Sequence, residues 1–156
     1  MTVSSNPTDH QHSVDVEAPV RVAYNQWTQF EEFPKFMKGV EEIRQITDDT
    51  LHWKVEISGV TREFDTVISE QTPDQRIAWT TVDGPKHAGV VTFHSIDDDT
   101  TRVTLQMDYE PEGFLENVAD KIGFVSSRLK SDMENFKEFI EDRSVSTGAW
   151  RGTIEK

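Results

Sequence analysis

Arg62 is the residue whose position in the chain points most directly to chemistry. It falls in the run VTREFDTVISEQ, in the same alternating phase as Phe64 and Ile68, so a strand would turn its guanidinium inward. A buried charge without compensation is strongly unfavourable. Arg62 therefore needs a ligand carboxylate or carbonyl, or an internal partner such as Glu42 or Glu63, unless a bulge in the strand turns it outward.

Tyr109 and His94 are the other candidates for catalytic work. Tyr109 ends an alternating run and can present its hydroxyl to a bound ring as a hydrogen-bond donor or weak acid, or it can cap the core beneath its strand. His94 could act as a general base, but its position in the strand does not decide whether its imidazole points inward or outward. His52 falls on a polar face. Arg62, Tyr109 and His94 do not decide whether the chain is an enzyme.

The sequence contains none of the other motifs that would indicate a nucleophilic, metal-binding or nucleotide-binding site. The chain has no cysteine, so disulfides, a thiol nucleophile and Cys-ligated metal are excluded. His10 and His12 lack the spacing of a metal motif, and no GxSxG elbow, P-loop or dinucleotide fingerprint occurs. The acidic run 97–99 lacks the ligand spacing of a calcium loop. We expect no metal and no cofactor.

Charge and composition narrow the partners and the location. The 156 residues, enough for one domain, carry 16 basic and 29 acidic side chains, a net charge of −13. This charge repels phosphate backbones and anionic lipid, so we expect no nucleic-acid partner. No apolar run approaches the roughly 20 residues of a membrane span, and MTVSSNPTDHQH does not read as a secretory signal. We expect a cytoplasmic, acidic protein without stable membrane insertion.

One long helix is predicted near the end of the chain, over residues 115–142. Its apolar residues recur at alternating steps of three and four and therefore form one stripe: Leu115, Val118, Ile122, Val125, Leu129, Met133, Phe136 and Ile140. At about 1.5 Å per residue this helix is roughly 42 Å long. A neighbouring helix in so small a protein cannot cover it, whereas a curved sheet can.

The preceding residues predict that sheet. Alternation predicts strands over 13–17, 40–46, 51–57, 60–71, 76–82, 89–96 and 102–109, with a helix opening at Ala18-Pro19 and a second short helix or turn around Pro34. Short turns between consecutive strands favour an antiparallel meander. We expect a disordered segment over 1–11, a domain over 12–143 and a tail over 144–156, although Trp150 beside Arg151 is unusual for a disordered end.

The sequence is similar to the polyketide cyclase/dehydrase and coenzyme Q-binding family of the START-like superfamily. The resemblance rests on VDVEAPVRVAYNQWTQFEEFPKFMKGVEEI, WTTVDGPKHAGVVTF and TRVTLQMDYEPEG, and runs from about His12 to Asp142. It implies an α+β helix-grip fold: a seven-stranded antiparallel sheet wrapped around the C-terminal helix, with two short helices after the first strand. It also implies a cavity for an apolar ligand between sheet and helix.

A ligand site can be predicted from the inward phases. The strands contribute Trp53, Arg62, Phe64, Trp79, Met107 and Tyr109; the helix contributes Val118 and Ile122; Phe33, Phe36 and Met37 could form a mouth. Bulky apolar side chains around a concavity suit a lipid, a quinone or a polyketide-like compound. The same side chains could instead simply fill a core. The leading hypothesis is binding or transport of such a hydrophobic small molecule.

Two other functions stay open. An aromatase/cyclase or dehydratase would hold a poly-ketone in one folded shape, because proximity and orientation alone accelerate a reaction; Arg62 and Tyr109 would polarise a carbonyl. A protein-interaction module would use the tail around Trp150 to dock on a partner or on a second copy as a homodimer. The fold cannot choose among these functions.

Overall fold

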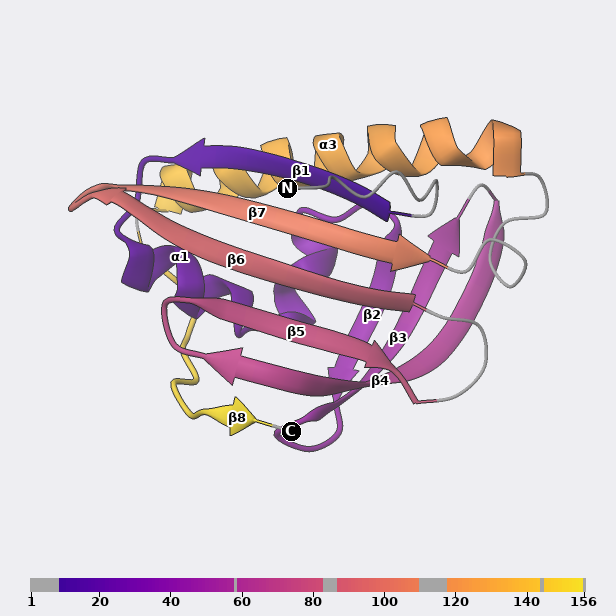
Figure 1. Cartoon of the computed structure of the whole chain (residues 1–156), viewed down its shortest axis with the longest axis horizontal. Helices are drawn as coiled ribbons and strands as arrows, with labels where there is room; N and C mark the ends of the chain where they lie inside the picture. Colours follow the sequence, from indigo (N-terminus) through magenta and orange to yellow (C-terminus); the bar gives the residue numbers. More distant parts are fainter. Residues whose placement is uncertain (1–8, 58, 83–86, 110–117, 144, 156) are drawn as a thin grey trace, which may run out of the picture.

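The protein is a curled antiparallel sheet with a long helix along one edge (Figure 1). The computed structural model describes residues 9–57, 59–82, 87–109, 118–143 and 145–155. The strands are β1 (Asp9–Val16), β2 (Val40–Gln45), β3 (Thr50–Ile57), β4 (Val60–Thr72), β5 (Arg76–Thr81), β6 (His87–Asp97), β7 (Thr100–Tyr109) and β8 (Ile154–Glu155). The helices are α1 (Val20–Trp27), the 3-10 helix η1 (Phe30–Lys35) and α3 (Val118–Arg143).

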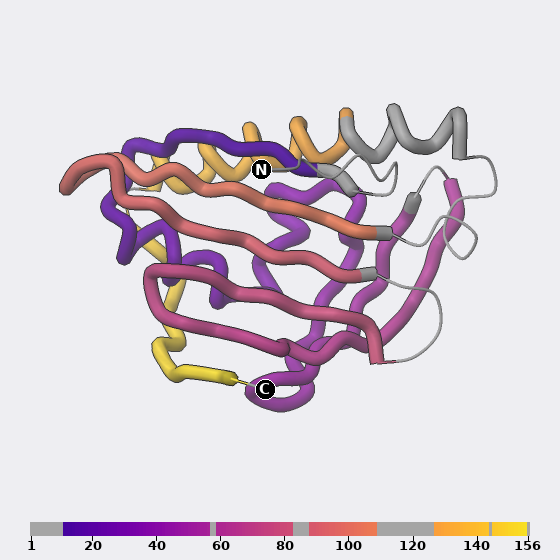
Figure 2. The backbone as a smooth tube through the Cα atoms, viewed as in Figure 1, coloured from indigo at the N-terminus to yellow at the C-terminus, as the bar shows by residue number. Residues whose placement is uncertain are grey.

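The strand order confirms the predicted meander. It is β1-β7-β6-β5-β4-β3-β2, with β8 beside β4 and every pairing antiparallel. The sheet curls strongly, so that β2 and β3 run steeply across the direction of β6 and β7 (Figure 2). The sheet-around-helix arrangement expected from the sequence is therefore confirmed, with β8 as an addition.

Side-chain alternation gives the sheet one buried face, called the concave face below. On β7 the side chains of Val103, Leu105 and Met107 are buried, while Arg102 before them is exposed and Thr104 and Gln106 between them are half-buried. On β3, Trp53 repeats the pattern, flanked by half-buried polar neighbours. Burial of such side chains stabilises the fold by about 1.5–3 kcal/mol each. The two-residue period therefore decides which face meets the helices.

The C-terminal half of α3 is bound firmly to this face. Its buried stripe consists of Leu129, Met133, Phe136 and Ile140. On the β1 side, the Lys137 ammonium donates to the Asp15 carbonyl oxygen at 2.7 Å, and the Glu141 carboxylate accepts from the Glu17 backbone N–H at 2.8 Å. The helix follows the β1 edge (Figure 1).

The opposite side of α3 is tied to the segment between η1 and β2. The Asn135 side-chain amide donates to the Phe36 carbonyl oxygen at 3.2 Å. One helical turn earlier, the Asp132 carboxylate accepts from the Lys38 backbone N–H, also at 3.2 Å. Together with the contacts to β1, these bonds fix this half of the helix across the opening between the two outer strands of the sheet.

Aromatic rings from three elements interlock beneath this half of α3. Trp27 of α1 lies 5.1 Å from Phe33 and 5.2 Å from Phe136 between ring centroids. Phe36 lies 5.8 Å from Trp27 and 5.2 Å from Phe136. We call these four residues the closed aromatic core, because each is at most 1% exposed.

The predicted N-terminal boundary was placed too late. Strand β1 begins at Asp9 and pairs with β7 along its whole length, with Asp9 opposite Asp108 and His12 opposite Leu105. Residues 9–11 therefore belong to the sheet and not to a disordered segment. The polar His12 on the phase of Val14 and Val16 concealed this, because a strand held by ladder hydrogen bonds needs no apolar residue at each inward position.

The C-terminal segment 145–155 is part of the domain and not a loose tail. Thr147 exchanges two hydrogen bonds with the fully buried amide of Gln26, at 2.8 and 2.9 Å. Arg151 donates to Asn25 at 2.7 Å and to Asp74 at 2.8 Å. Strand β8 then pairs with β4 through Gln71 and Ile154. Polar contacts hold the segment, so its sequence carries no apolar period.

Candidate functional site

A flat aromatic layer covers the part of the concave face formed by β3, β4 and β5. Trp53 and Phe64 are opposite each other in register on β3 and β4, with ring centroids 6.0 Å apart and an interplanar angle of 13°. Trp79 of β5 lies 5.9 Å from Trp53 at 29°. These three residues are called the tryptophan layer below. Neighbouring strands present their side chains in parallel, which is why the rings lie nearly flat against one another.

The two indole N–H groups of this layer differ in their partners. Trp53 Nε1 donates to the buried Thr66 hydroxyl oxygen at 2.7 Å. Trp79 Nε1 is buried and has no acceptor among the described residues. A buried donor without an acceptor costs about 1–3 kcal/mol and is uncommon in native structures. The Trp79 N–H is thus a polar group for which the described part of the chain supplies no partner.

Glycine 89 makes room for the Trp79 ring. Trp79 is opposite Gly89 in the register of β5 and β6, and Gly89 is opposite Met107 on β7. A Cβ at position 89 would lie 2.5 Å from Trp79 Cζ2, 2.7 Å from Cε2 and 2.9 Å from Met107 Sδ. The Cε2–Cζ2 edge of Trp79, next to Nε1, therefore occupies space that the Cβ of any other residue at position 89 would fill.

Arg62 lies on the concave face, on the phase predicted from the sequence. It is opposite Val55 in the β3–β4 register and is half-buried two residues before Phe64 on β4. Its Nη1 is 3.5 Å from the Thr61 carbonyl oxygen. A cationic group thus stands at the end of the tryptophan layer, on the strand that also carries Phe64.

Phe33, Phe36 and Met37 do not form the mouth expected from the sequence. Phe33 is fully buried, Phe36 is 1% exposed, and both belong to the closed aromatic core. Met37 is buried at the end of the same segment. The run FEEFPKFM reveals that these side chains are apolar, but it cannot reveal that α1 and α3 would close over them.

Three predicted ligand residues fall outside the described side chains: Tyr109, Val118 and Ile122. Of the others, Met107 is buried beside Gly89 and next to the tryptophan layer. Trp53, Arg62, Phe64, Trp79 and Met107 therefore share one face of the sheet. Phe33 and Phe36 belong to the closed aromatic core, and Met37 is buried beside them. The two groups meet where the Phe33 ring lies 6.3 Å from that of Trp53.

Two histidines of the described strands, His94 and His52, lie away from the concave face, whereas the half-buried His12 of β1 shares the phase of the buried Val14 and Val16. His94 is exposed on the outer face, opposite Arg102 in register, so it does not share a face with Arg62. His52 also lies on the outer face, as predicted, between Asp65 at 2.6 Å and Glu63 at 3.0 Å. Hydrogen bonds to Asp65 and then to Glu63 raise the pKa of His52.

Asp132 is a buried acid that sequence reasoning missed. It is 7% exposed on α3, and burial raises the pKa of its carboxyl to about 7, against the opposing effects of the Lys38 backbone N–H and Arg128. The position follows Leu129 by three residues and precedes Met133, so it borders the apolar stripe. A carboxyl group beside such a stripe is the only sequence signal that could have revealed it.

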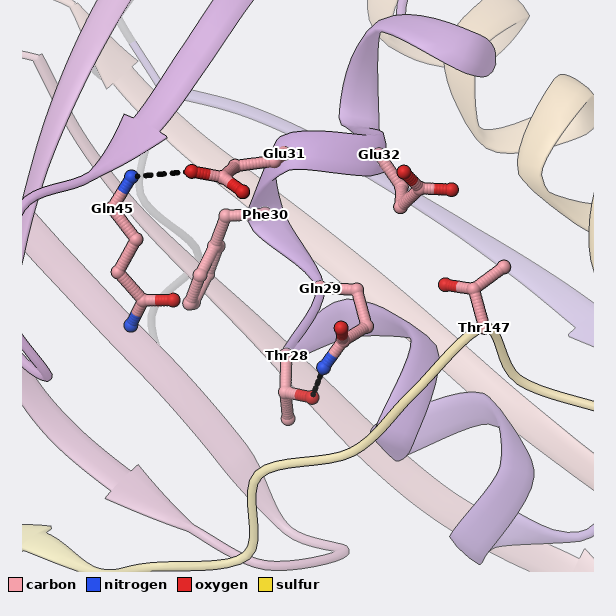
Figure 3. Close-up of a pocket in the computed structure, with 7 residues that line it drawn as sticks. All are labelled: Thr28, Gln29, Phe30, Glu31, Glu32, Gln45 and Thr147. Carbon is pink, nitrogen blue, oxygen red and sulfur yellow. Dashed lines mark hydrogen bonds between the residues drawn. The ribbon is translucent and has the colours of Figure 1, made fainter.

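A polar hollow of about 210 Å³ lies beside the end of α1 and the η1 helix (Figure 3). It is lined by Thr28, Gln29, Phe30, Glu31, Glu32, Gln45 and Thr147. The Glu31 carboxylate accepts from the Gln45 backbone N–H at 3.1 Å, and Gln29 donates to the Thr28 hydroxyl at 2.9 Å. These side chains bind one another, and their polarity does not suit an apolar ligand.

Neither a metal site nor a membrane span is found in the part of the chain that the structure describes. No three His, Asp or Glu side chains gather there closely enough to hold an ion. No helix among the described residues has the length and apolar character needed to cross a bilayer.

Solved structures with the same architecture place the fold in the START-like class. The Zhui aromatase/cyclase of Streptomyces sp. R1128 superimposes with a TM-score of 0.73 at 13% identity, over 91% of this chain and 98% of that one. A START superfamily protein of Mycobacterium smegmatis gives 0.66 at 17% identity, over 87% and 96% of the two chains. Identities this low show the fold alone.

The sequence then gives the family. Residues 16–138 match the family described as polyketide cyclase/dehydrase and lipid transport. The chain belongs to this family. It is also 56% identical over 145 residues to a 17.2 kDa protein encoded between melC2 and rnhH in Streptomyces lincolnensis, covering 92% of this chain and 97% of that protein. Family and fold together suggest hydrophobic ligand binding or polyketide cyclase/aromatase activity.

Proposed function

We propose that the protein binds a planar or polycyclic apolar small molecule against the tryptophan layer and carries it or presents it to a partner. The observation that carries the proposal is the near-parallel arrangement of Trp53, Phe64 and Trp79 on a concave face. Flat rings offer a large apolar contact area and stack favourably on another flat ring, for about 0.5–1.5 kcal/mol per pair beyond burial.

Charge and chemistry support binding over catalysis. The cation beside the tryptophan layer is Arg62, whereas His52 and His94 lie on the outer face and His12 lies on β1, outside the layer. General acid–base work needs a titratable group within hydrogen-bond reach of the reacting atom. Burial with one or two polar contacts is therefore the activity that this face performs, with Arg62 and Met107 at the border of the layer.

A direct test uses an uncharged polarity-sensitive dye such as Nile red and two phenylalanine variants. Phe64 is half-buried in the layer, and Phe139 is half-buried on α3 against Phe36, 5.5 Å between centroids. We expect Phe64→Leu to weaken dye binding about 2- to 13-fold, the equivalent of one aromatic contact, and Phe139→Leu to leave it unchanged. Wild-type protein that binds no dye and retains no apolar compound in a native mass spectrum would refute the proposal.

The second candidate is a cyclase acting on a poly-ketone. Arg62 favours it, because a guanidinium beside the layer can polarise a carbonyl oxygen, and Tyr109 was predicted to assist from β7. Incubation with a poly-β-ketone distinguishes the two functions. Ring formation that Arg62→Met abolishes while dye binding persists would establish the cyclase; binding without turnover supports the carrier.

A further inference from the structure

We propose that the Trp79 indole N–H is the polar anchor of the ligand site, donating a hydrogen bond to an acceptor oxygen on the rim of a planar ligand. The inference rests on the proposed function and narrows it: the ligand carries a carbonyl or comparable acceptor oxygen on its ring system and is not a plain hydrocarbon. Its basis is the Trp79 indole N–H, the one buried donor of the tryptophan layer that finds no acceptor among the residues the structure describes.

The neighbours of Trp79 cannot supply an acceptor. In register beside it are Ile68, which is fully buried, and Gly89, which has no side chain. Met107 brings its sulfur close to the same space, but a thioether is a weak acceptor. The buried hydroxyl of Thr66, on the same face of β4 as Phe64 and Ile68, already accepts from Trp53.

No neighbouring aromatic ring among the described residues is oriented to accept the Trp79 N–H through its π face either. Trp79 meets Trp53 at 29°, so the two rings are nearly parallel and the N–H runs along the face of its neighbour. Trp27 has a buried N–H without an acceptor too, but its neighbours Phe33 and Phe36 are inclined at 72° and 64°. That edge-to-face geometry lets an N–H point at a π system. The closed aromatic core therefore offers Trp27 a compensation that Trp79 lacks.

A ligand oxygen suits the Trp79 N–H better than a water molecule does. An enclosed water needs two to four polar partners to be stable, and Ile68, Gly89 and Met107 provide none that is strong. A carbonyl group on an otherwise apolar ring needs one donor and buries its remaining surface against the layer. Trp79 thus fixes the in-plane orientation of a ligand whose face is set by Trp53 and Phe64.

The test compares two probes of the same ring skeleton, menadione (a methyl-naphthoquinone) and methylnaphthalene. For each protein variant the ratio of their dissociation constants isolates the contribution of the carbonyl oxygens. We expect Trp79→Phe to reduce the preference for menadione about 2- to 13-fold, the equivalent of one neutral hydrogen bond. Trp27→Phe, which removes the other buried indole N–H, leaves the ratio as in the wild type.

A measurement on the unaltered protein covers the case in which Trp79→Phe misfolds. The four tryptophans give separate indole resonances in a ¹H–¹⁵N spectrum. Menadione should move the Trp79 indole proton downfield, and methylnaphthalene should not. If both probes bind but the Trp79 resonance responds equally to them, or the ratio survives Trp79→Phe, the anchor is wrong and the binding function stands. If neither probe binds, both proposals fail.

Discussion

The closed aromatic core and the tryptophan layer are built from similar side chains and differ in how the chain delivers them. The rings of the core come from α1, the η1 segment and α3, and meet at angles of 58° and 72° around Trp27. The rings of the layer come from adjacent strands and lie at 13° and 29° to Trp53. Rings from crossing elements meet at steep angles, whereas rings from neighbouring strands lie nearly parallel. Trp53 and Trp79 are 2% and 3% exposed, and Phe64 is half-buried.

Under the proposed function, the two halves of the concave face have different roles. Contacts from both sides hold the C-terminal half of α3 over the core, through Lys137 and Glu141 toward β1 and through Asp132 and Asn135 toward the η1–β2 segment. Stability is concentrated there. The tryptophan layer retains an unpartnered donor and a nearby cation, which are features of a binding surface.

The largest expected effect comes from truncating a ring in the closed aromatic core, compared with truncating a ring in the tryptophan layer. Phe136→Ala removes a fully buried ring from the core and should lower the free energy of unfolding by about 3–5 kcal/mol. Phe64→Ala, on a half-buried ring of the layer, should cost less stability and more affinity for a planar probe. Urea unfolding measures the stability of both variants, and dye titration measures their affinity for the planar probe. Equal losses in both assays would abolish the distinction between the two regions.

The next effect concerns the pH dependence of the helix contact. Because burial raises the pKa of Asp132 to about 7, the folded protein binds this proton more tightly than the unfolded chain, whose value is 3.8. Its contribution to stability is therefore largest below the unfolded pKa and is lost as pH rises toward and through 7, by an amount on the order of 4 kcal/mol at most.

Asp132→Asn should remove this slope and stabilise the protein at pH 8 relative to the wild type. Urea unfolding of both proteins between pH 4 and 8 is the measurement. His52, which has a raised pKa on the outer face, contributes a smaller loss of the same sign above its own pKa. An unchanged slope in the Asn variant would show that Asp132 is not the titrating group.

A smaller effect follows from the glycine beneath the layer. Gly89→Ala places a Cβ 2.5 Å from Trp79 Cζ2, and overpacking of this kind costs about 1–3 kcal/mol. Because Trp79 must move away from Trp53, the near-ultraviolet circular dichroism of the stacked indoles should weaken. Val90→Ala, on the neighbouring half-buried position of β6, is the control. An intact signal in Gly89→Ala would contradict the tight placement of Trp79.

The smallest expected effect lies on the side of α1. Arg151→Ala removes charge-assisted hydrogen bonds to Asn25 and Asp74 and a cation–π contact with Tyr24, 5.4 Å from guanidinium to ring centroid. We expect a loss of about 1–2 kcal/mol in the free energy of unfolding, with unchanged dye affinity because the segment lies away from the layer. A loss of dye binding would place the C-terminal segment in the site.

The sequence predicted the fold because its apolar periods are regular. The alternation of Val103, Leu105 and Met107 and the helical stripe ending at Ile140 each require one face to be buried, and an antiparallel sheet around a helix satisfies both. Contacts that are polar leave no such period. The exchange between Gln26 and Thr147, which fixes the C-terminal segment, joins residues that no pattern relates.

The candidate site was predicted only in part, for a related reason. Phase along β3 and β4 places Trp53, Arg62 and Phe64 on one face, as found. The position of a residue in a strand or helix period does not tell which other helix will cover it. Phe33 and Phe36 were therefore expected at an opening, but they lie in the core. The unpartnered Trp79 N–H depends on what its neighbours lack, and only three-dimensional packing reveals it.

A crystal structure of the protein grown with menadione tests the central claim most directly. The account predicts the ring system in van der Waals contact with Trp53 and Phe64, with one carbonyl oxygen within hydrogen-bond distance of Trp79 Nε1. A concave face filled by the protein's own side chains, with the probe absent or bound in the polar hollow beside Glu31, would contradict it.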